Sequence, residues 1–151
     1  MANNGTFDVT LTRERGYEFV VRFEEDGIPE LTVDQLPPLG RGAGPNPTAL
    51  LAAAVGSCLG ASLLYCLQKS RVDVGGMTTE VHGTIERNDK GRLRVTRIEV
   101  RLAPEVDDVD GARVMRCVDL FEDFCTVTES VRQGIKVDVV VAPRVRMTGP
   151  A

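Results

Sequence analysis

The stretch "GPNPTALLAAAVGSCLGASLLYCLQKS", residues 44–70, decides the fold of this 151-residue chain. Asn46 followed by Pro47 predicts a helix start, because asparagine caps free backbone amides and proline suits the first helical position. Apolar and small residues continue nearly all round the helix to about Ser70, with Lys69 near its negative end. A helix that is apolar on every side is typical of a protein core.

The uncharged run from Gly42 to Gln68 also raises the alternative of a membrane span, since its apolar part is close to membrane length. Its small residues, and the alternating segments on either side of it, favour a buried helix instead. The N-terminal residues contain no basic region followed by an apolar core, so no secretory signal is predicted. We therefore expect a cytoplasmic protein with no membrane association, in which cysteines are thiols unless they perform redox chemistry.

The composition argues against a nucleic-acid partner. The net charge is −4 and the sequence pI is about 5.1, so the chain has no overall positive field to attract phosphates. Aromatic residues make up only 5% of the chain, which further weakens any mode of binding through base stacking.

Alternating apolar and polar residues predict strands on both sides of the helix. These segments are residues 7–12, 17–23 and 31–33 before it, and 76–86, 92–103 and 135–141 after it. A change of alternation in the fifth strand predicts a bulge near Thr96. A second helix is expected over residues 108–125, and a short helical turn over 127–133 that ends at Gly134.

The resulting order is β-β-β-α-β-β-α-β, which predicts a single α+β domain over residues 1–151 with a mostly antiparallel sheet and a central buried helix. The three strands ahead of the first helix are not expected to close a hydrophobic core by themselves. Intertwining with a second copy of the chain is therefore expected.

The four cysteines form two pairs, Cys58 with Cys66 and Cys117 with Cys125, each spaced by eight positions on a predicted helix. Eight residues of helix rise by about 12 Å, whereas the Cα atoms of a disulfide lie within about 7 Å. Any bridge must therefore join the two helices. No Cys-x2-Cys knuckle is present and His82 stands alone, so no metal site is predicted. Cys66 and Cys117 are expected to be small buried hydrophobic residues.

Cys58 and Cys125 lie in more unusual surroundings. Gly56 and Gly60 flank Cys58 although each glycine costs a helix about 1 kcal/mol, so they either clear space around the sulfur or allow close packing. Cys125 stands where the second helix breaks into "CTVTES", a place where the backbone can move. A thiol on a rigid helix and a thiol on a junction suit attack and resolution in a redox cycle.

Activation of Cys58 requires a cation, because the residue is too far inside its helix for the dipole of that helix to lower the pKa of the thiol. Arg41, in the glycine-rich loop before the helix, is the first candidate. Arg15 and Arg22 on the first hairpin are the alternatives.

These features together resemble the OsmC/Ohr family (osmotically inducible protein C and organic hydroperoxide resistance protein). The similarity rests on "GPNPTALLAAAVGSCLGASL" and on "CTVTESVRQGIKVDVVV", and it extends over nearly the whole chain. The resemblance implies an intertwined homodimer with two sites at its interface. It also implies that Cys58 attacks the peroxide, that Cys125 resolves the sulfenic acid, and that a lipoyl-type dithiol restores the enzyme without a bound cofactor or metal.

The chain also departs from the family pattern. Family peroxidases orient an activating arginine with a glutamate that follows Asn-Pro, and this chain has Thr48 there. Thr126 replaces the proline that usually follows the second cysteine. The leading hypothesis is a thiol-dependent peroxidase acting on organic hydroperoxides in oxidative stress defence, with Cys58, Cys125 and Arg41 as catalytic residues. The alternatives are a non-enzymatic module that binds an apolar small molecule or acyl chain, and another thiol reaction such as thioester cleavage or redox sensing.

Overall fold

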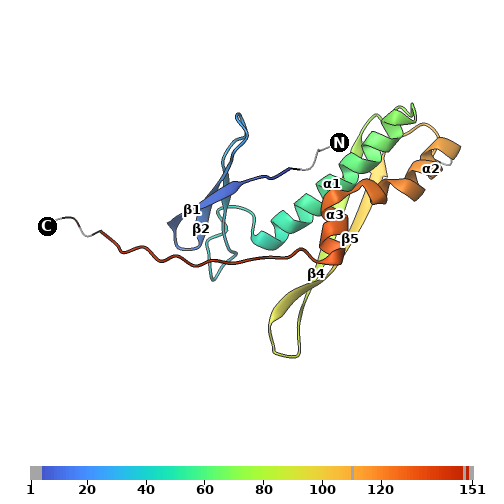
Figure 1. Cartoon of the computed structure of the whole chain (residues 1–151). Coiled ribbons are helices and arrows are strands. Elements are labelled where there is room, and N and C mark those ends of the chain that lie inside the picture. The colour runs from blue at the N-terminus through green and yellow to red at the C-terminus, as the bar shows by residue number, and fades with distance from the viewer. Residues whose placement is uncertain (1–4, 110, 148, 150–151) are drawn as a thin grey trace.

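The computed structural model describes residues 5–109, 111–147 and 149 of the chain. It is an α+β structure with two separate antiparallel sheets and one long helix (Figure 1). A small N-terminal sheet lies at one end of the molecule, and a body of helices and a two-stranded ribbon lies at the other. The expected fold class is confirmed.

The long helix α1 (Pro47–Lys69) begins and ends as its sequence predicts. The side chain of Asn46 accepts a hydrogen bond of 2.9 Å from the amide of Ala49, which satisfies one of the free donors of the first turn. At the other end the amide of Ser70 donates to the carbonyl of Cys66. A local signal therefore sets the start of this helix.

The N-terminal sheet consists of β1 (Val9–Arg15), β2 (Glu18–Phe23) and β3 (Leu31–Val33) in sequential antiparallel order. It buries only Val21 and Val33 among its apolar residues. The sheet has no extensive contact with any of the other described helices or strands. Most of its apolar surface is therefore exposed within one chain.

The second sheet is a long hairpin of β4 (Met77–Arg87) and β5 (Leu93–Pro104). Its pairing jumps between Thr84 opposite Arg97 and Ile85 opposite Val95, so Thr96 has no partner. The predicted bulge at Thr96 is confirmed. Below this bulge the hairpin extends beyond the helices, and above it the strands pack on α1 (Figure 1).

The predicted second helix is broken into two elements, α2 (Ala112–Leu120) and the 3-10 helix η1 (Phe121–Phe124). After Cys125 follows α3 (Thr126–Gln133), which ends at Gly134 with a φ of 76°, as its C-cap glycine predicts. These elements cover one side of α1. The core lies between them, and consists of Val55, Leu59, Leu63, Leu67, Val114, Cys117, Phe121 and Cys125.

The strand predicted over residues 135–141 is wrong for the single chain. Residues 135–147 run away from α3 as an extended tail without assigned secondary structure (Figure 1). Ile135, Val137 and Val139 are 63%, 77% and 78% exposed. A β-strand needs a neighbour to satisfy its backbone groups, and no described segment of this chain pairs with the tail.

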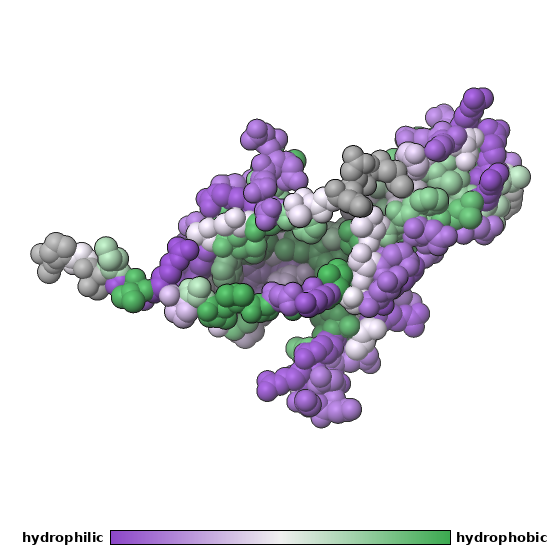
Figure 2. Space-filling model, viewed as in Figure 1, coloured by the Kyte–Doolittle hydropathy of each residue, from purple (hydrophilic) through white to green (hydrophobic). Residues whose placement is uncertain are grey.

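Among the described residues α1 is the one helix long and apolar enough to cross a membrane by length and composition. It packs against β4, β5, α2, η1 and α3. Only 28% of its most apolar window is buried within the single chain. Figure 2 shows hydrophobic surface gathered around a hollow in the middle of the molecule.

Candidate functional site

The structure brings Cys58 and Cys125 together. Cys58 lies on α1 and is partly exposed, whereas Cys125 is 1% exposed at the start of α3. Each thiol shifts the pKa of the other, which places the two side chains beside each other, and neither cysteine is in a disulfide. The two residues expected to act as a redox pair are therefore neighbours.

The N-terminus of α3 surrounds this pair with hydrogen-bond donors. The backbone amides of Val127 and Thr128 face Cys58, and the Thr128 amide also faces Cys125. The Thr128 hydroxyl lies 3.0 Å from Cys125 Sγ, where it accepts from the thiol and can donate to a thiolate. Sequence reasoning considered only the helix that carries Cys58. The helical turn that the sequence predicts just after Cys125 was not connected with the thiols, although its free amides favour negative charge.

The environment moves the pKa values of the two thiols in opposite directions. Burial raises the pKa of Cys58, and the hydrogen bond to Cys125 raises it further. Burial also acts to raise the pKa of Cys125, but the hydrogen bonds from Cys58, Thr128 and Ser62 outweigh it and lower the pKa. The lowered pKa of Cys125 favours a thiolate on this residue, and the Cys58 thiol is placed to donate to it.

The glycines beside Cys58 serve close packing. A Cβ atom at Gly56 would lie 2.7 Å from Val81 Cγ2, and one at Gly60 would lie 3.2 Å from Thr79 Oγ1. Both neighbours are on β4, so the glycines let α1 approach this strand. The alternative that they clear space around the Cys58 sulfur is not what the geometry shows.

Cys66 and Cys117 are joined by a disulfide, with their Cα atoms 5.6 Å apart. The prediction that both are merely buried hydrophobic thiols is wrong. Spacing alone requires any bridge to join two helices, and this one joins α1 to α2. In the structure Cys66 lies opposite Cys117, and Cys58 lies opposite Cys125. The sequence did not specify which pair is bonded.

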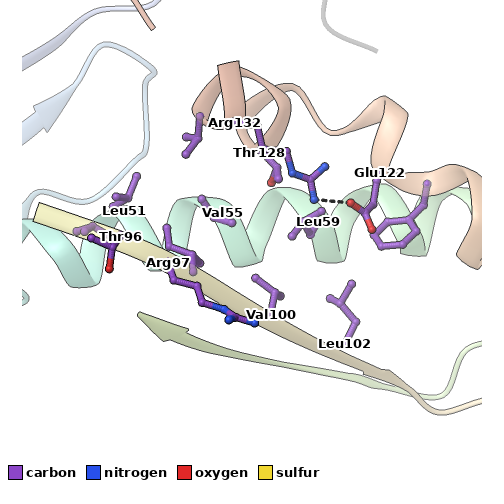
Figure 3. Close-up of a pocket in the computed structure, with 14 residues that line it drawn as sticks. Leu51, Val55, Leu59, Thr96, Arg97, Val100, Leu102, Glu122, Thr128 and Arg132 are labelled. Atoms are coloured by element: carbon purple, nitrogen blue, oxygen red, sulfur yellow. Dashed lines mark hydrogen bonds and ion pairs between the residues drawn. The ribbon is translucent and has the colours of Figure 1, made fainter. Parts of the chain in front are cut away.

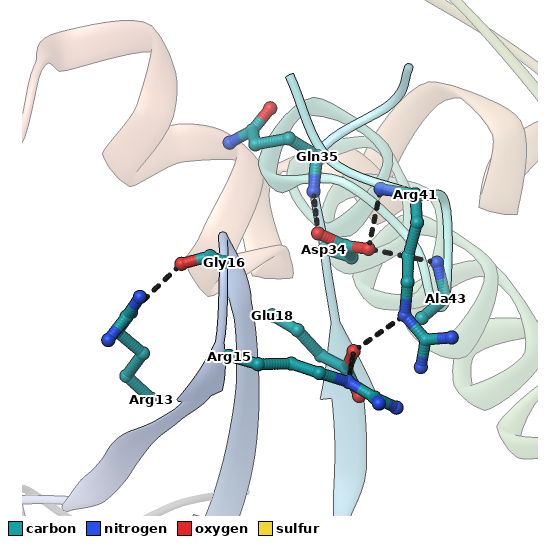
Figure 4. A network of polar contacts seen from close by, with 8 residues as sticks. All are labelled: Arg13, Arg15, Gly16, Glu18, Asp34, Gln35, Arg41 and Ala43. Atoms are coloured by element: carbon teal, nitrogen blue, oxygen red, sulfur yellow. Dashed lines mark hydrogen bonds and ion pairs between the residues drawn. The ribbon is translucent and has the colours of Figure 1, made fainter. Parts of the chain in front are cut away.

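Arg41 lies outside the immediate surroundings of the thiols within one chain. Its Nε donates a hydrogen bond of 2.9 Å to Glu18 Oε2, which also accepts from Arg15 Nε at 3.1 Å (Figure 4). Hydrogen bonds from Arg41 and Arg15 lower the pKa of Glu18. Two of the three candidate arginines therefore share one carboxylate, and Glu18 is a partner that sequence spacing did not reveal.

A buried carboxylate holds the loop that carries Arg41. Asp34, 3% exposed, accepts hydrogen bonds from the backbone amides of Gln35, Arg41 and Ala43 at 2.8 to 3.1 Å (Figure 4). Hydrogen bonding from the Ala43 amide is the largest cause that lowers the pKa of Asp34. The third candidate, Arg22, pairs with Glu30 instead.

A groove of about 430 Å³, lined mostly by apolar residues, opens beside Thr128 between α1, β5 and α3 (Figure 3). Leu51, Val55 and Leu59 of α1 form one wall, and Val100 and Leu102 of β5 form another. Thr128, which contacts Cys125, lines the same groove. The groove therefore brings apolar surface close to the thiol pair.

Arg132 also lines this groove, where it pairs with Glu122 (Figure 3). Glu129 is its second carboxylate partner. These two hydrogen bonds raise the pKa of its guanidinium. Sequence reasoning did not single out this arginine, although Glu129 one helical turn before Arg132 is a recognisable pair. Among the described residues, no group of three or more His, Cys, Asp or Glu side chains could hold a metal ion.

Comparison with protein families gives a match over residues 40–140 to the family described as OsmC-like protein. No curated protein matches the chain significantly by sequence.

Several solved structures share the fold. An OsmC-like protein of unknown function from Vibrio cholerae is 20% identical, with a TM-score of 0.72 over 84% of this chain and 94% of that one. An organic hydroperoxide resistance protein from Elizabethkingia anophelis, with thiocyanate bound, is 21% identical, with a TM-score of 0.62 over 87% and 91%. The organic hydroperoxide resistance protein OhrB of Bacillus subtilis is 21% identical, with a TM-score of 0.57 over 85% of this chain and 91% of that one. At these identities the likeness establishes the fold.

Proposed function

The chain belongs to the OsmC-like protein family, and from this premise we propose that it is a thiol-dependent peroxidase that reduces organic hydroperoxides. The observation that carries the proposal is the pairing of Cys58 with Cys125 beside the N-terminus of α3, where each thiol shifts the pKa of the other. Organic hydroperoxide resistance proteins with the same fold support a role connected with peroxides.

The reaction divides between the two thiols according to their exposure. Cys58 is the more accessible sulfur, so its thiolate attacks the outer peroxide oxygen after its proton passes to Cys125. The O–O bond breaks, an alcohol leaves with a proton, and Cys58 becomes a sulfenic acid. The Cys125 thiolate then attacks the Cys58 sulfur and forms the Cys58–Cys125 disulfide. The displaced hydroxide takes up a proton and leaves as water. A lipoyl-type dithiol returns both sulfurs to thiols and is itself oxidised to a disulfide.

The groove beside Thr128 supports an organic rather than an inorganic peroxide. Its leucine and valine walls favour an alkyl or aryl group, because burial of apolar surface contributes about 25 cal/mol per Å². Arg132 at the same groove supplies a fixed positive charge for a polar group of the substrate. The hydroperoxide group would then lie toward the thiols.

A homodimer completes the proposal. The N-terminal sheet has little to pack against, residues 135–147 pair with no described segment of the chain, and only 28% of the most apolar window of α1 is buried within one chain. A second copy would cover these surfaces and would place Arg41 and Glu18 of one chain near the thiol pair of the other. Glu18 would then orient Arg41, in place of the family's glutamate at the position where this chain has Thr48. We also propose a cytoplasmic location, where such dithiols are reduced.

The test is consumption of cumene hydroperoxide with dihydrolipoamide as reductant. Cys58→Ser is expected to abolish turnover, and Cys125→Ser is expected to allow one round of oxidation without efficient recycling. If Cys58→Ser turns over as fast as the wild type, the proposal fails.

A second candidate is a binding protein for an apolar small molecule or acyl chain. The same groove favours it, since a volume of about 430 Å³ is typical of ligand sites. Native mass spectrometry of the purified protein is expected to show a retained ligand in this case. An empty protein that binds no fatty acid offered to it would count against this function.

A further inference from the structure

The Cys66–Cys117 disulfide has a cavity of its own, distinct from the groove beside the other two cysteines. This cavity of about 530 Å³ lies between the C-terminal half of α1 and the α2–η1 segment. Its lining residues are Ser62, Tyr65, Cys66, Lys69, Ser70, Arg116, Leu120 and Phe124. We propose that this disulfide is a second redox site, which a small anionic thiol reduces by attacking Cys66 from the cavity.

The exposure of the two cysteines shows which sulfur an incoming thiolate can attack. Cys66 is partly exposed and lines the cavity, whereas Cys117 is 0% exposed and does not line it. Thiol–disulfide exchange depends on which sulfur the incoming thiolate can reach. Attack therefore falls on Cys66 Sγ, and Cys117 is the leaving group.

The leaving sulfur has a hydrogen-bond partner in place. Ser70 Oγ lies 3.4 Å from Cys117 Sγ and can donate to it as negative charge develops. Release of a thiolate is faster when its charge is stabilised. A serine at the end of α1 thus has a chemical role beyond its position at the helix terminus.

The charge of the cavity selects the class of thiol. Lys69 and Arg116 line it, and no acidic side chain is among its lining residues. Lys69 is held with its Nζ 5.6 Å from the centre of the Tyr65 ring. Two cations over apolar and aromatic surface favour a thiol that carries a carboxylate or sulfonate.

Reduction of the Cys66–Cys117 bond takes two thiol–disulfide exchanges. The first thiolate forms a mixed disulfide with Cys66, and the electron pair of the broken S–S bond goes to Cys117, which takes up a proton. A second thiol attacks the mixed disulfide, releases the oxidised small molecule and leaves Cys66 as a thiol. The Cys58 thiol takes no direct part, because two helical turns separate it from Cys66 by about 12 Å. The inference therefore stands independently of the proposed function.

The test compares 2-mercaptoethanesulfonate with cysteamine, an anionic and a cationic thiol, at equal thiolate concentration and low salt. Alkylation and peptide mass spectrometry follow opening of the Cys66–Cys117 bond in the wild-type chain and in Cys58→Ser/Cys125→Ser. The anionic thiol is expected to react about tenfold faster, and the preference is expected to shrink at high salt. Lys69→Gln/Arg116→Gln should abolish the preference.

Lys90→Gln/Arg92→Gln is the matched control, because it removes the same charge at the distant turn of the β4–β5 hairpin and should retain the preference. Regiochemistry is tested with the oxidised disulfide of mercaptoethanesulfonate. Cys117→Ser should form the mixed disulfide at Cys66, and Cys66→Ser should form little at Cys117. Equal rates with both thiols, preferential modification of Cys117, or absence of the bond from the purified chain would overturn the inference.

Discussion

Gly56→Ala adds one methyl group to α1 at the place where this helix lies closest to β4. The new Cβ would stand 2.7 Å from Val81 Cγ2 and 3.3 Å from Thr79 Cγ2. Contacts below 3.0 Å are not tolerated, so the helix or the strand must shift.

The magnitude follows from two opposing effects. Alanine in place of glycine stabilises a helix interior by about 1 kcal/mol, whereas overpacking a core position costs about 1–3 kcal/mol. We expect a net destabilisation of about 1 kcal/mol, which corresponds to a fall in Tm of about 2–4 °C for a chain of this size. Ser57→Ala, at the exposed neighbouring position of the same helix, should instead stabilise slightly.

Urea unfolding at fixed protein concentration measures both variants, and a double-mutant cycle with Val81→Ala isolates the contact. Because Val81→Ala removes the clashing methyl group, Gly56→Ala should cost less in that background, by about 1 kcal/mol or more. The alkylation rate of Cys58 should not change. Gly56→Ala that stabilises the protein while slowing alkylation of Cys58 would refute the packing account and restore the idea that the glycine clears space for the thiol.

Three further predictions concern the disulfide, a buried carboxylate and the thiol pair. Cys66→Ser opens a loop of 51 residues and should lower the free energy of unfolding by about 4 kcal/mol in the chain-entropy model, measured by urea unfolding; no change would show that Cys117 is not bridged in solution. The folded state lowers the pKa of Asp34 below its usual value of 3.8, so the stabilisation is present above about pH 4 and is lost as the pH falls through the folded pKa. Asp34→Asn should therefore flatten the acid side of a plot of urea midpoint against pH, and an unchanged slope would contradict this. Cys58→Ala removes a hydrogen-bond donor and should raise the pKa of Cys125 in pH-dependent alkylation; an unchanged or lower pKa would contradict the shared-proton arrangement.

Features with local signals were predictable from the sequence. Asn46 and Pro47 fix the start of α1, Gly134 ends α3, and the change of alternation at Thr96 marks the bulge. Each depends on residues within a few positions of the feature. The chemistry of the backbone at these positions leaves few alternatives.

Features that depend on contacts between distant segments could not be predicted from the sequence. The segment over residues 135–141 has the alternation of a strand, but pairing requires a neighbour that one chain does not supply. The Cys66–Cys117 bond and the Glu18–Arg41 ion pair join segments far apart in sequence. Sequence spacing limits such pairs without selecting among them.

Oxidation of the reduced protein by one equivalent of cumene hydroperoxide, followed by alkylation and peptide mapping, tests the central claim most directly. The account predicts a disulfide between Cys58 and Cys125, formed with loss of two thiols per chain, and a sulfenic acid on Cys58 when Cys125 is replaced by serine. Oxidation confined to the Cys66 and Cys117 pair, or a Cys58 that stays reduced throughout, would contradict it.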